Sequence, residues 1–137
     1  MKSLKVLTLV VYFLFPFCFC ISLHSKVIAQ TRPSTCEEAR HAFDESISSW
    51  LRSKERFVIF VFHKGMHETA QDIIDKRMKS VVAHINFREV DDRHFVMAEG
   101  KKRNGLGKLD IYVEGQIAWE LYAAQNAEIG ADCRSKQ

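Results

Sequence analysis

The sequence is poor in the residues on which several protein classes depend. It has 2 prolines and 4 cysteines in 137 residues. The cysteines form no Cys-x-x-Cys pair, which excludes a thiol–disulfide exchange site of that kind. The sequence also lacks a Gly-x-Ser-x-Gly elbow and the glycine fingerprints that open a helix after a strand. Because we also find no nucleophile–base set, we predict a protein that is not an enzyme.

An excess of charge of one sign is also missing once the N-terminal segment is set apart. Residues 1–29 contain Lys2, Lys5 and Lys26 but no acidic residue. The 20 Lys and Arg residues less these three leave 17, which equals the 17 Asp and Glu residues. A balanced charge gives no global attraction to nucleic acid or to an anionic surface, so neither is predicted as a partner.

Residues 1–29 have the composition of an export signal. A basic start and an apolar run over 6–23 precede a small-residue exit at Ala29. We expect cleavage before Gln30, location in the periplasm or outside the cell, and no membrane association afterwards. An uncleaved membrane anchor is the alternative, because the apolar run is long. The remainder, 30–137, has the size of one domain with one core.

Two cysteines remain beyond the predicted cleavage site, close to the opposite ends of the domain. They are Cys36 and Cys133. One pair of cysteines in an exported chain predicts a disulfide between them. Two unpaired thiols are the alternative.

Hydrophobic periodicity predicts alternating helices and strands. Thr35 and Glu38 have the spacing of a capping box and predict a helix over 36–52. An unbroken apolar run predicts a buried strand at 57–62, followed by a glycine-containing corner. Apolar residues at helical spacing then predict a second helix; they occupy positions 66, 70, 73, 74, 78, 81, 82 and 85.

Three further strands are predicted in the second half, over 94–98, 108–114 and 117–121, and a turn at Glu114 and Gly115 joins the last two as a hairpin. In the strand 108–114, Asp110 is among the residues that alternate onto the solvent side. The loop 100–107 has a basic centre, and we interpret it as a flexible connection rather than a phosphate cradle. The whole pattern, helix–strand–helix–strand–strand–strand, predicts an α+β or α/β fold in a small two-layer sandwich.

Two histidines at the corner are candidate site residues. His63 and His67 are four positions apart, a spacing at which two imidazoles on one helix chelate a metal. Gly65 lies between them and no third ligand is evident, so we favour polar corner residues and predict no metal. The corner is still the place where an open α/β sheet binds a ligand.

Arg77 is the third candidate, because it lies near the apolar stripe of the second helix. It either pairs with an acid such as Asp75 or Glu99, or presents its planar fork to a carboxylate ligand.

The segment Ile73–Val82 is similar to a helix motif, Leu-Ser-x-x-Arg-Ala-x-x-Val, with Arg77 on its arginine. Val96–Gly100 is similar to a strand that ends in a glycine-rich turn, and Lys108–Val113 to a closing Arg-Val-Glu-Ile strand. Together these segments resemble the peptidoglycan-binding OmpA-like C-terminal domain over about residues 40–114. The second half also resembles short exported bacterial proteins of no assigned function.

The OmpA-like resemblance implies that topology and a cell-wall ligand. In that family a strand-end aspartate and the helix arginine hold the diaminopimelate group of the peptide stem. Here Arg77 would bind the carboxylate, with His63 and His67 lining the corner, although the corner has no Thr-Asp. We therefore predict an exported, non-enzymatic cell-envelope module without a cofactor, which binds peptidoglycan or another carboxylate-bearing ligand.

Two alternatives remain open. A buried strand followed by a helix also opens the thioredoxin fold, so a redox-inactive thioredoxin-like binding domain is the first. That fold has a cis-proline before a later strand, whereas Pro33 is the only proline after residue 29. The second alternative is a metal site at His63 and His67.

Overall fold

The structure is a computed structural model that describes residues 32–53 and 57–130, apart from the side chains of Ser53 and Asp92. The predicted export signal and Cys133 lie outside these residues. The elements in chain order are α2 (Cys36–Ser53), β1 (Val58–His63), α3 (Ile73–Phe87), a short 3-10 turn η1 (Asp92–His94), β2 (Phe95–Glu99), β3 (Gly107–Val113) and β4 (Gln116–Ala123). This order confirms the predicted mixed α and β fold class.

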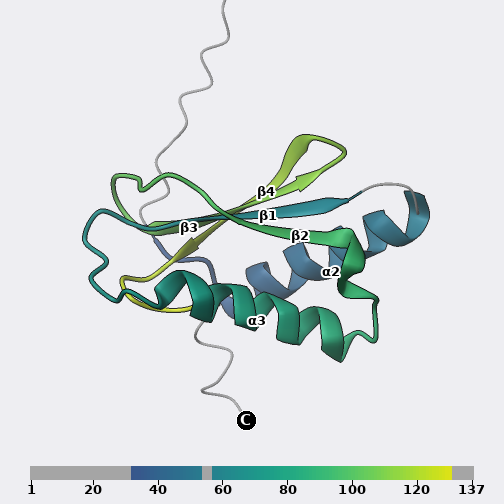
Figure 1. Ribbon diagram of the computed structural model, residues 1–137, viewed down its shortest axis with the longest axis horizontal. Coiled ribbons are helices and arrows are strands. Elements are labelled where there is room, and N and C mark those ends of the chain that lie inside the picture. Colours follow the sequence, from purple (N-terminus) through teal and green to yellow (C-terminus); the bar gives the residue numbers. More distant parts are fainter. Residues whose placement is uncertain (1–31, 54–56, 131–137) are drawn as a thin grey trace, which may run out of the picture.

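The four strands form one sheet in the order β2-β1-β3-β4. β1 runs parallel to β2 and antiparallel to β3, and β3 is antiparallel to β4. Both helices lie on one face of this sheet (Figure 1), so the described residues form two layers. No helix within the described ranges is both long and apolar enough to cross a membrane.

The core lies between the sheet and the two helices. Strand residues alternate between the faces, so every second side chain of β1 points to the helices and is buried. The core side chains on the strands include Val58, Phe60, Phe62, Phe95, Leu109, Ile111 and Leu121. Those on the helices include Ala42, Phe43, Ile47, Ile73, Val81 and Ile85.

The first helix begins as the capping box predicts. The Glu38 backbone N–H donates to Thr35 Oγ1 at 3.2 Å, and the Thr35 N–H donates to Glu38 Oε2 at 2.8 Å. Cys36, its first residue, is disulfide-bonded. Because Cys133 lies outside the described residues, the pairing of these two cysteines stays a prediction.

The second helix begins seven residues later than the apolar spacing predicted. The segment 66–72 is not helical, with turns at 66–67 and 71–72, and α3 begins at Ile73. The backbone N–H groups of Thr69 and Ala70 donate to Asn126 Oδ1 at 3.0 and 3.1 Å. A side chain distant in the sequence thus accepts from two backbone donors of the non-helical segment before α3.

A tight hairpin joins the last two strands, as predicted from Glu114 and Gly115. Both residues have positive φ, 58° and 78°. Two positive φ values are typical of the type I′ turn, whose twist matches that of the flanking strands.

Candidate functional site

The basic loop 100–107 is attached to the corner that follows β1. The Gly100 N–H donates to the Phe62 carbonyl oxygen at 2.8 Å, and the Arg103 N–H donates to the Lys64 carbonyl oxygen at 3.0 Å. Gly65 and Arg103 also form an isolated parallel bridge. The loop connects β2 with β3 as expected, and its backbone also continues the pairing of β1 with β2.

A glycine permits this close approach. A Cβ atom on Gly65 would lie 2.6 Å from the Gly105 carbonyl oxygen and 2.8 Å from the Gly107 nitrogen. Both contacts are to backbone, which moves only if the loop moves. The corner therefore needs glycine at this position.

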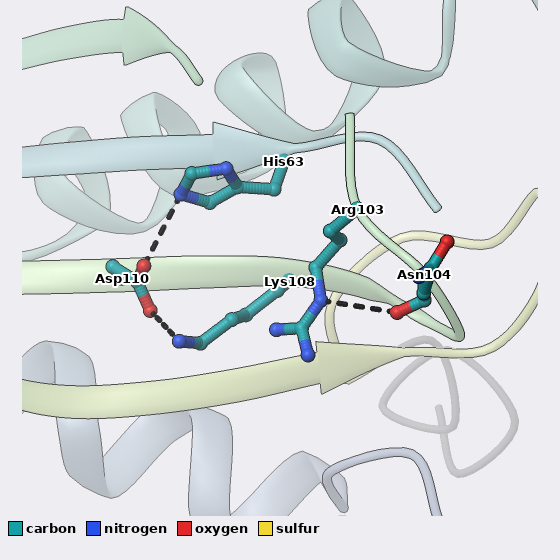
Figure 2. Close-up of a pocket in the computed structure, with 5 residues that line it drawn as sticks. All are labelled: His63, Arg103, Asn104, Lys108 and Asp110. Atoms are coloured by element: carbon teal, nitrogen blue, oxygen red, sulfur yellow. Dashed lines mark hydrogen bonds and ion pairs between the residues drawn. The ribbon is translucent and has the colours of Figure 1, made fainter. Parts of the chain in front are cut away.

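Corner, loop and β3 together enclose an open pocket of about 350 Å³. Figure 2 shows its lining: His63 from the end of β1, Lys108 and Asp110 from β3, and Arg103 and Asn104 from the loop. Register explains why they meet, since His63 pairs with Lys108 across the two antiparallel strands. Lys108 is paired with Asp110 and with Glu120 beside the pocket, so Arg103 is the cation of the lining that is left to attract an anion.

Both ring nitrogens of His63 face oxygen atoms. Nδ1 lies 2.9 Å from the Lys101 carbonyl oxygen, and Nε2 lies 3.1 Å from Asp110 Oδ2. A carbonyl oxygen only accepts, so Nδ1 carries a proton. The second contact is a hydrogen bond when either the imidazole or Asp110 holds one further proton. Gly100 leaves room for the ring, since a Cβ there would lie 2.3 Å from His63 Cε1.

Lys108 joins two carboxylates at the side of the pocket. Its Nζ lies 2.7 Å from Asp110 Oδ1 and forms a second ion pair with Glu120. Burial alone would lower the pKa of Lys108, but the two carboxylates outweigh that effect and raise it. Lys108 is therefore charged and already paired, and Asp110 is shared between Lys108 and His63.

Arg103 is the cation of the pocket with the fewest protein partners. Its Cζ lies 5.2 Å from the centre of the Tyr122 ring, and its Nε donates to the Asn104 carbonyl oxygen at 3.4 Å. Among the described residues no carboxylate forms an ion pair with it. A guanidinium held on an aromatic ring keeps its N–H edge for a planar acceptor such as a carboxylate.

Behind the pocket, Arg77 and Glu68 form a buried ion pair. The Arg77 side chain is 0% exposed. Its Nη1 donates to Glu68 Oε2 at 2.9 Å, its Nη2 to Glu68 Oε1, and its Nε to the Ala127 carbonyl oxygen at 2.9 Å. Burial alone would raise the pKa of Glu68, but hydrogen bonds from Arg77, Gly65 and Asn126 hold it below its usual value.

The partner of Arg77 is thus Glu68, whereas Asp75 and Glu99 are exposed. Gly107 packs against the guanidinium, since a Cβ there would lie 2.4 Å from Arg77 Nη1. A ligand would reach Arg77 only if this ion pair opened. The carboxylate-binding role stays a prediction for Arg77, and the geometry favours Arg103 for it.

The two candidate histidines have different positions. His63 lines the pocket, whereas His67 is exposed in the turn after Gly65 and is not part of the lining. No group of three or more His, Cys, Asp or Glu side chains suited to a metal occurs within the described ranges. The structure therefore does not bring His63 and His67 into a three-ligand site.

Sequence reasoning did not select Arg103, Lys108 or Asp110 as site residues. Asp110 was expected on the solvent side of its strand, yet it is only 5% exposed because His63 and Lys108 cover it. The feature of the sequence that could have indicated them is the basic loop directly before β3. That His63 lies opposite this part of β3 depends on the strand register, which the sequence pattern does not give.

The pH dependence of stability provides a test of the Glu68 interactions. Because the native pKa of Glu68 lies below its ordinary value of 4.5, its contribution is complete above that value and is lost as the pH falls through the native pKa. We expect the free energy of unfolding to fall as the pH drops below 4.5, and Glu68→Gln to reduce that slope. Denaturant unfolding followed by circular dichroism measures both.

The matched control for this test is Asp72→Asn. Asp72 pairs with Lys76 on the surface, where both side chains are more than half exposed. Exposed pairs contribute little to stability. An equal change of slope in Asp72→Asn and Glu68→Gln would contradict the assignment to the buried pair.

Comparisons with models of known protein families, with curated proteins and with solved structures found no match.

Proposed function

We propose that this protein is an exported, non-enzymatic binding module of the cell envelope, and that the pocket beside β1 takes a carboxylate-bearing ligand. The single observation that carries this proposal is the guanidinium of Arg103, which lies over Tyr122 and lines the pocket. Asp110 and Glu120 are both paired with Lys108, so neither carboxylate forms an ion pair with Arg103.

Peptidoglycan is one source of such a ligand, because its peptide stems carry free carboxylates. The OmpA-like resemblance supports this source, although the arginine that it singles out is enclosed by Glu68. A free peptide C-terminus is another source of the same chemistry. The pocket is accessible to either one without opening the buried ion pair.

Substituting Arg103 tests the proposal. We expect wild-type protein to sediment with purified murein sacculi, and Arg103→Ala to bind at least about tenfold more weakly, because a charge-assisted hydrogen bond is lost. Arg52→Ala is the matched control, since Arg52 is an exposed arginine at the end of α2 whose guanidinium donates to Ser49. A second arm replaces sacculi by diglycine, a small peptide with a free carboxylate, and follows binding by NMR.

The two arms separate the sources of the carboxylate. Binding to sacculi but not to diglycine indicates a cell-wall ligand, and the reverse indicates a peptide terminus. Equal binding of wild type and Arg103→Ala in both arms would overturn the proposal.

A second candidate is the redox-inactive thioredoxin-like binding domain, and the strand order favours it. The order β2-β1-β3-β4, with β3 antiparallel to its neighbours, is that of the four-stranded thioredoxin core. The corner His63–Met66, where that fold has its cysteines, contains none. Gly107 begins β3, where that fold has its cis-proline. If the protein is such a domain, its ligand would be a protein or peptide, and the NMR experiment with diglycine tests for binding of a peptide carboxylate.

A further inference from the structure

The sheet face opposite the helices is not covered by any described element. Both helices lie on the other face (Figure 1). The side chains that alternate with the core residues of β1 are Ile59, Val61 and His63, and they are half-buried rather than buried. We call this side of the sheet the open face.

One end of the open face is apolar. The pairing of the strands places Val96, Ile59, Tyr112 and Ile117 in one row across all four strands. Val96 and Ile117, at the two edges of the row, are 42% and 49% exposed. A continuous apolar row on a folded surface is typical of a contact surface for another molecule.

The other end of the open face is the pocket that Arg103 lines. His63, Lys108 and Tyr122 form the corresponding row there, with Arg103 above the Tyr122 ring. Ile59 and His63 are four residues apart on β1, a separation of about 13 Å along the strand. The row between the two ends includes Val61, Asp110 and Glu120, and both carboxylates form ion pairs with Lys108.

We infer that the open face docks a peptide segment of a partner protein, with apolar side chains on the Val96–Ile117 row and a carboxylate on Arg103. Charge complementarity selects this occupant, because one end of the surface is apolar and the other carries the guanidinium of Arg103, with which no carboxylate of the described residues forms an ion pair. The separation of about 13 Å corresponds to about four residues of an extended peptide. The carboxylate end rests on the proposed function, whereas the apolar row is independent of it.

The experiment is an NMR titration of the isotope-labelled chain with two synthetic probes. One is an N-acetylated hexapeptide of alternating leucine and serine with a free C-terminal carboxylate, and the other is the same peptide with a C-terminal amide. We expect the acid to shift the signals of Ile59 and Tyr112 together with those of His63 and Arg103. The amide should bind about tenfold more weakly.

Two variants test the apolar row separately from the pocket. Val96→Asp and Ile117→Asp each change an exposed side chain on an edge strand, and each should weaken binding of the acid peptide about fivefold or more. Phe87→Asp is the matched control, because Phe87 is 74% exposed on α3 and lies at the end of a helix on the covered side. Unchanged signals of the core residues verify the fold of every variant.

The outcomes separate this inference from the proposed function. Shifts confined to His63 and Arg103, with full binding by both edge variants, would overturn the docking surface and leave the carboxylate site standing. Shifts confined to the apolar row, with equal binding of acid and amide, would overturn the assigned carboxylate position. Absence of any shift with the acid peptide would overturn the inference as a whole.

Discussion

Replacing Arg77 by alanine should lower the free energy of unfolding by about 3 to 5 kcal/mol, because it leaves the Glu68 carboxylate buried without its charge partner. The pair joins three parts of the chain: the corner, α3 and the segment that contains Ala127. A loss of this size is a large part of the stability of an ordinary domain. Chemical denaturation at neutral pH measures it.

Two further variants test whether that loss of stability comes from the unpaired Glu68 carboxylate. The double variant Glu68→Gln with Arg77→Met removes both charges and should recover part of the stability, since no buried charge is left without a partner. Arg88→Ala removes a partly exposed arginine from its pair with Asp44 and should cost about 1 kcal/mol or less. If Arg77→Ala were as mild as Arg88→Ala, the buried pair would not have the structural role that we assign to it.

Arg77→Lys addresses the role predicted from the OmpA-like resemblance. Lysine keeps the charge but not the planar fork. Loss of murein binding in a folded Arg77→Lys variant, with Arg103→Ala unaffected, would return the ligand role to Arg77. Retained binding in Arg77→Lys, with loss in Arg103→Ala, would assign that role to the pocket.

Removing the disulfide should also have a large effect. A bridge from Cys36 to Cys133 closes a loop of roughly 100 residues and contributes about 4 to 5 kcal/mol in the chain-entropy model. We expect Cys36→Ser and Cys133→Ser to lower the free energy of unfolding equally, and the double variant to be no less stable than either single one. Denaturant titrations measure the three values, and mass spectrometry of unreduced peptides identifies the bridge.

Additive losses from the two single variants would show that these cysteines are not partners. A wild-type protein whose stability does not change on reduction would contradict the predicted contribution of the bridge. Ser48→Ala provides a control for an ordinary substitution on the same helix.

Local patterns in the sequence were sufficient to predict most of the secondary structure. The reciprocal bonds of Thr35 and Glu38 involve residues three apart, and the turn at Glu114 and Gly115 depends on two adjacent residues. The start of α3 could not be predicted in this way. It depends on Asn126, which occupies the N–H groups of Thr69 and Ala70 from a distant part of the chain.

The candidate site was only partly predictable for the same reason. His63 was recognised because it follows a buried strand, but Asp110 and Lys108 come to it only through the register of β1 with β3. Arg77 stood out in its helix, yet its partner Glu68 belongs to a turn that was expected to be helical. Neither the register nor the turn follows from periodicity, because both depend on contacts between separate segments.

The central position of β1 has a consequence for the order of folding. β1 is the first strand of the described residues, and both of its neighbours follow it in the sequence: Val58 pairs with Phe95 on one side and with Val113 on the other. During synthesis, which starts at the N-terminus, the apolar strand β1 therefore stays exposed until β3 has been made. Because its sheet contacts are distant in sequence, we expect slower folding than in a helical bundle of similar size. Such a chain would stay unfolded, and dependent on protection from aggregation, until most of it had been made.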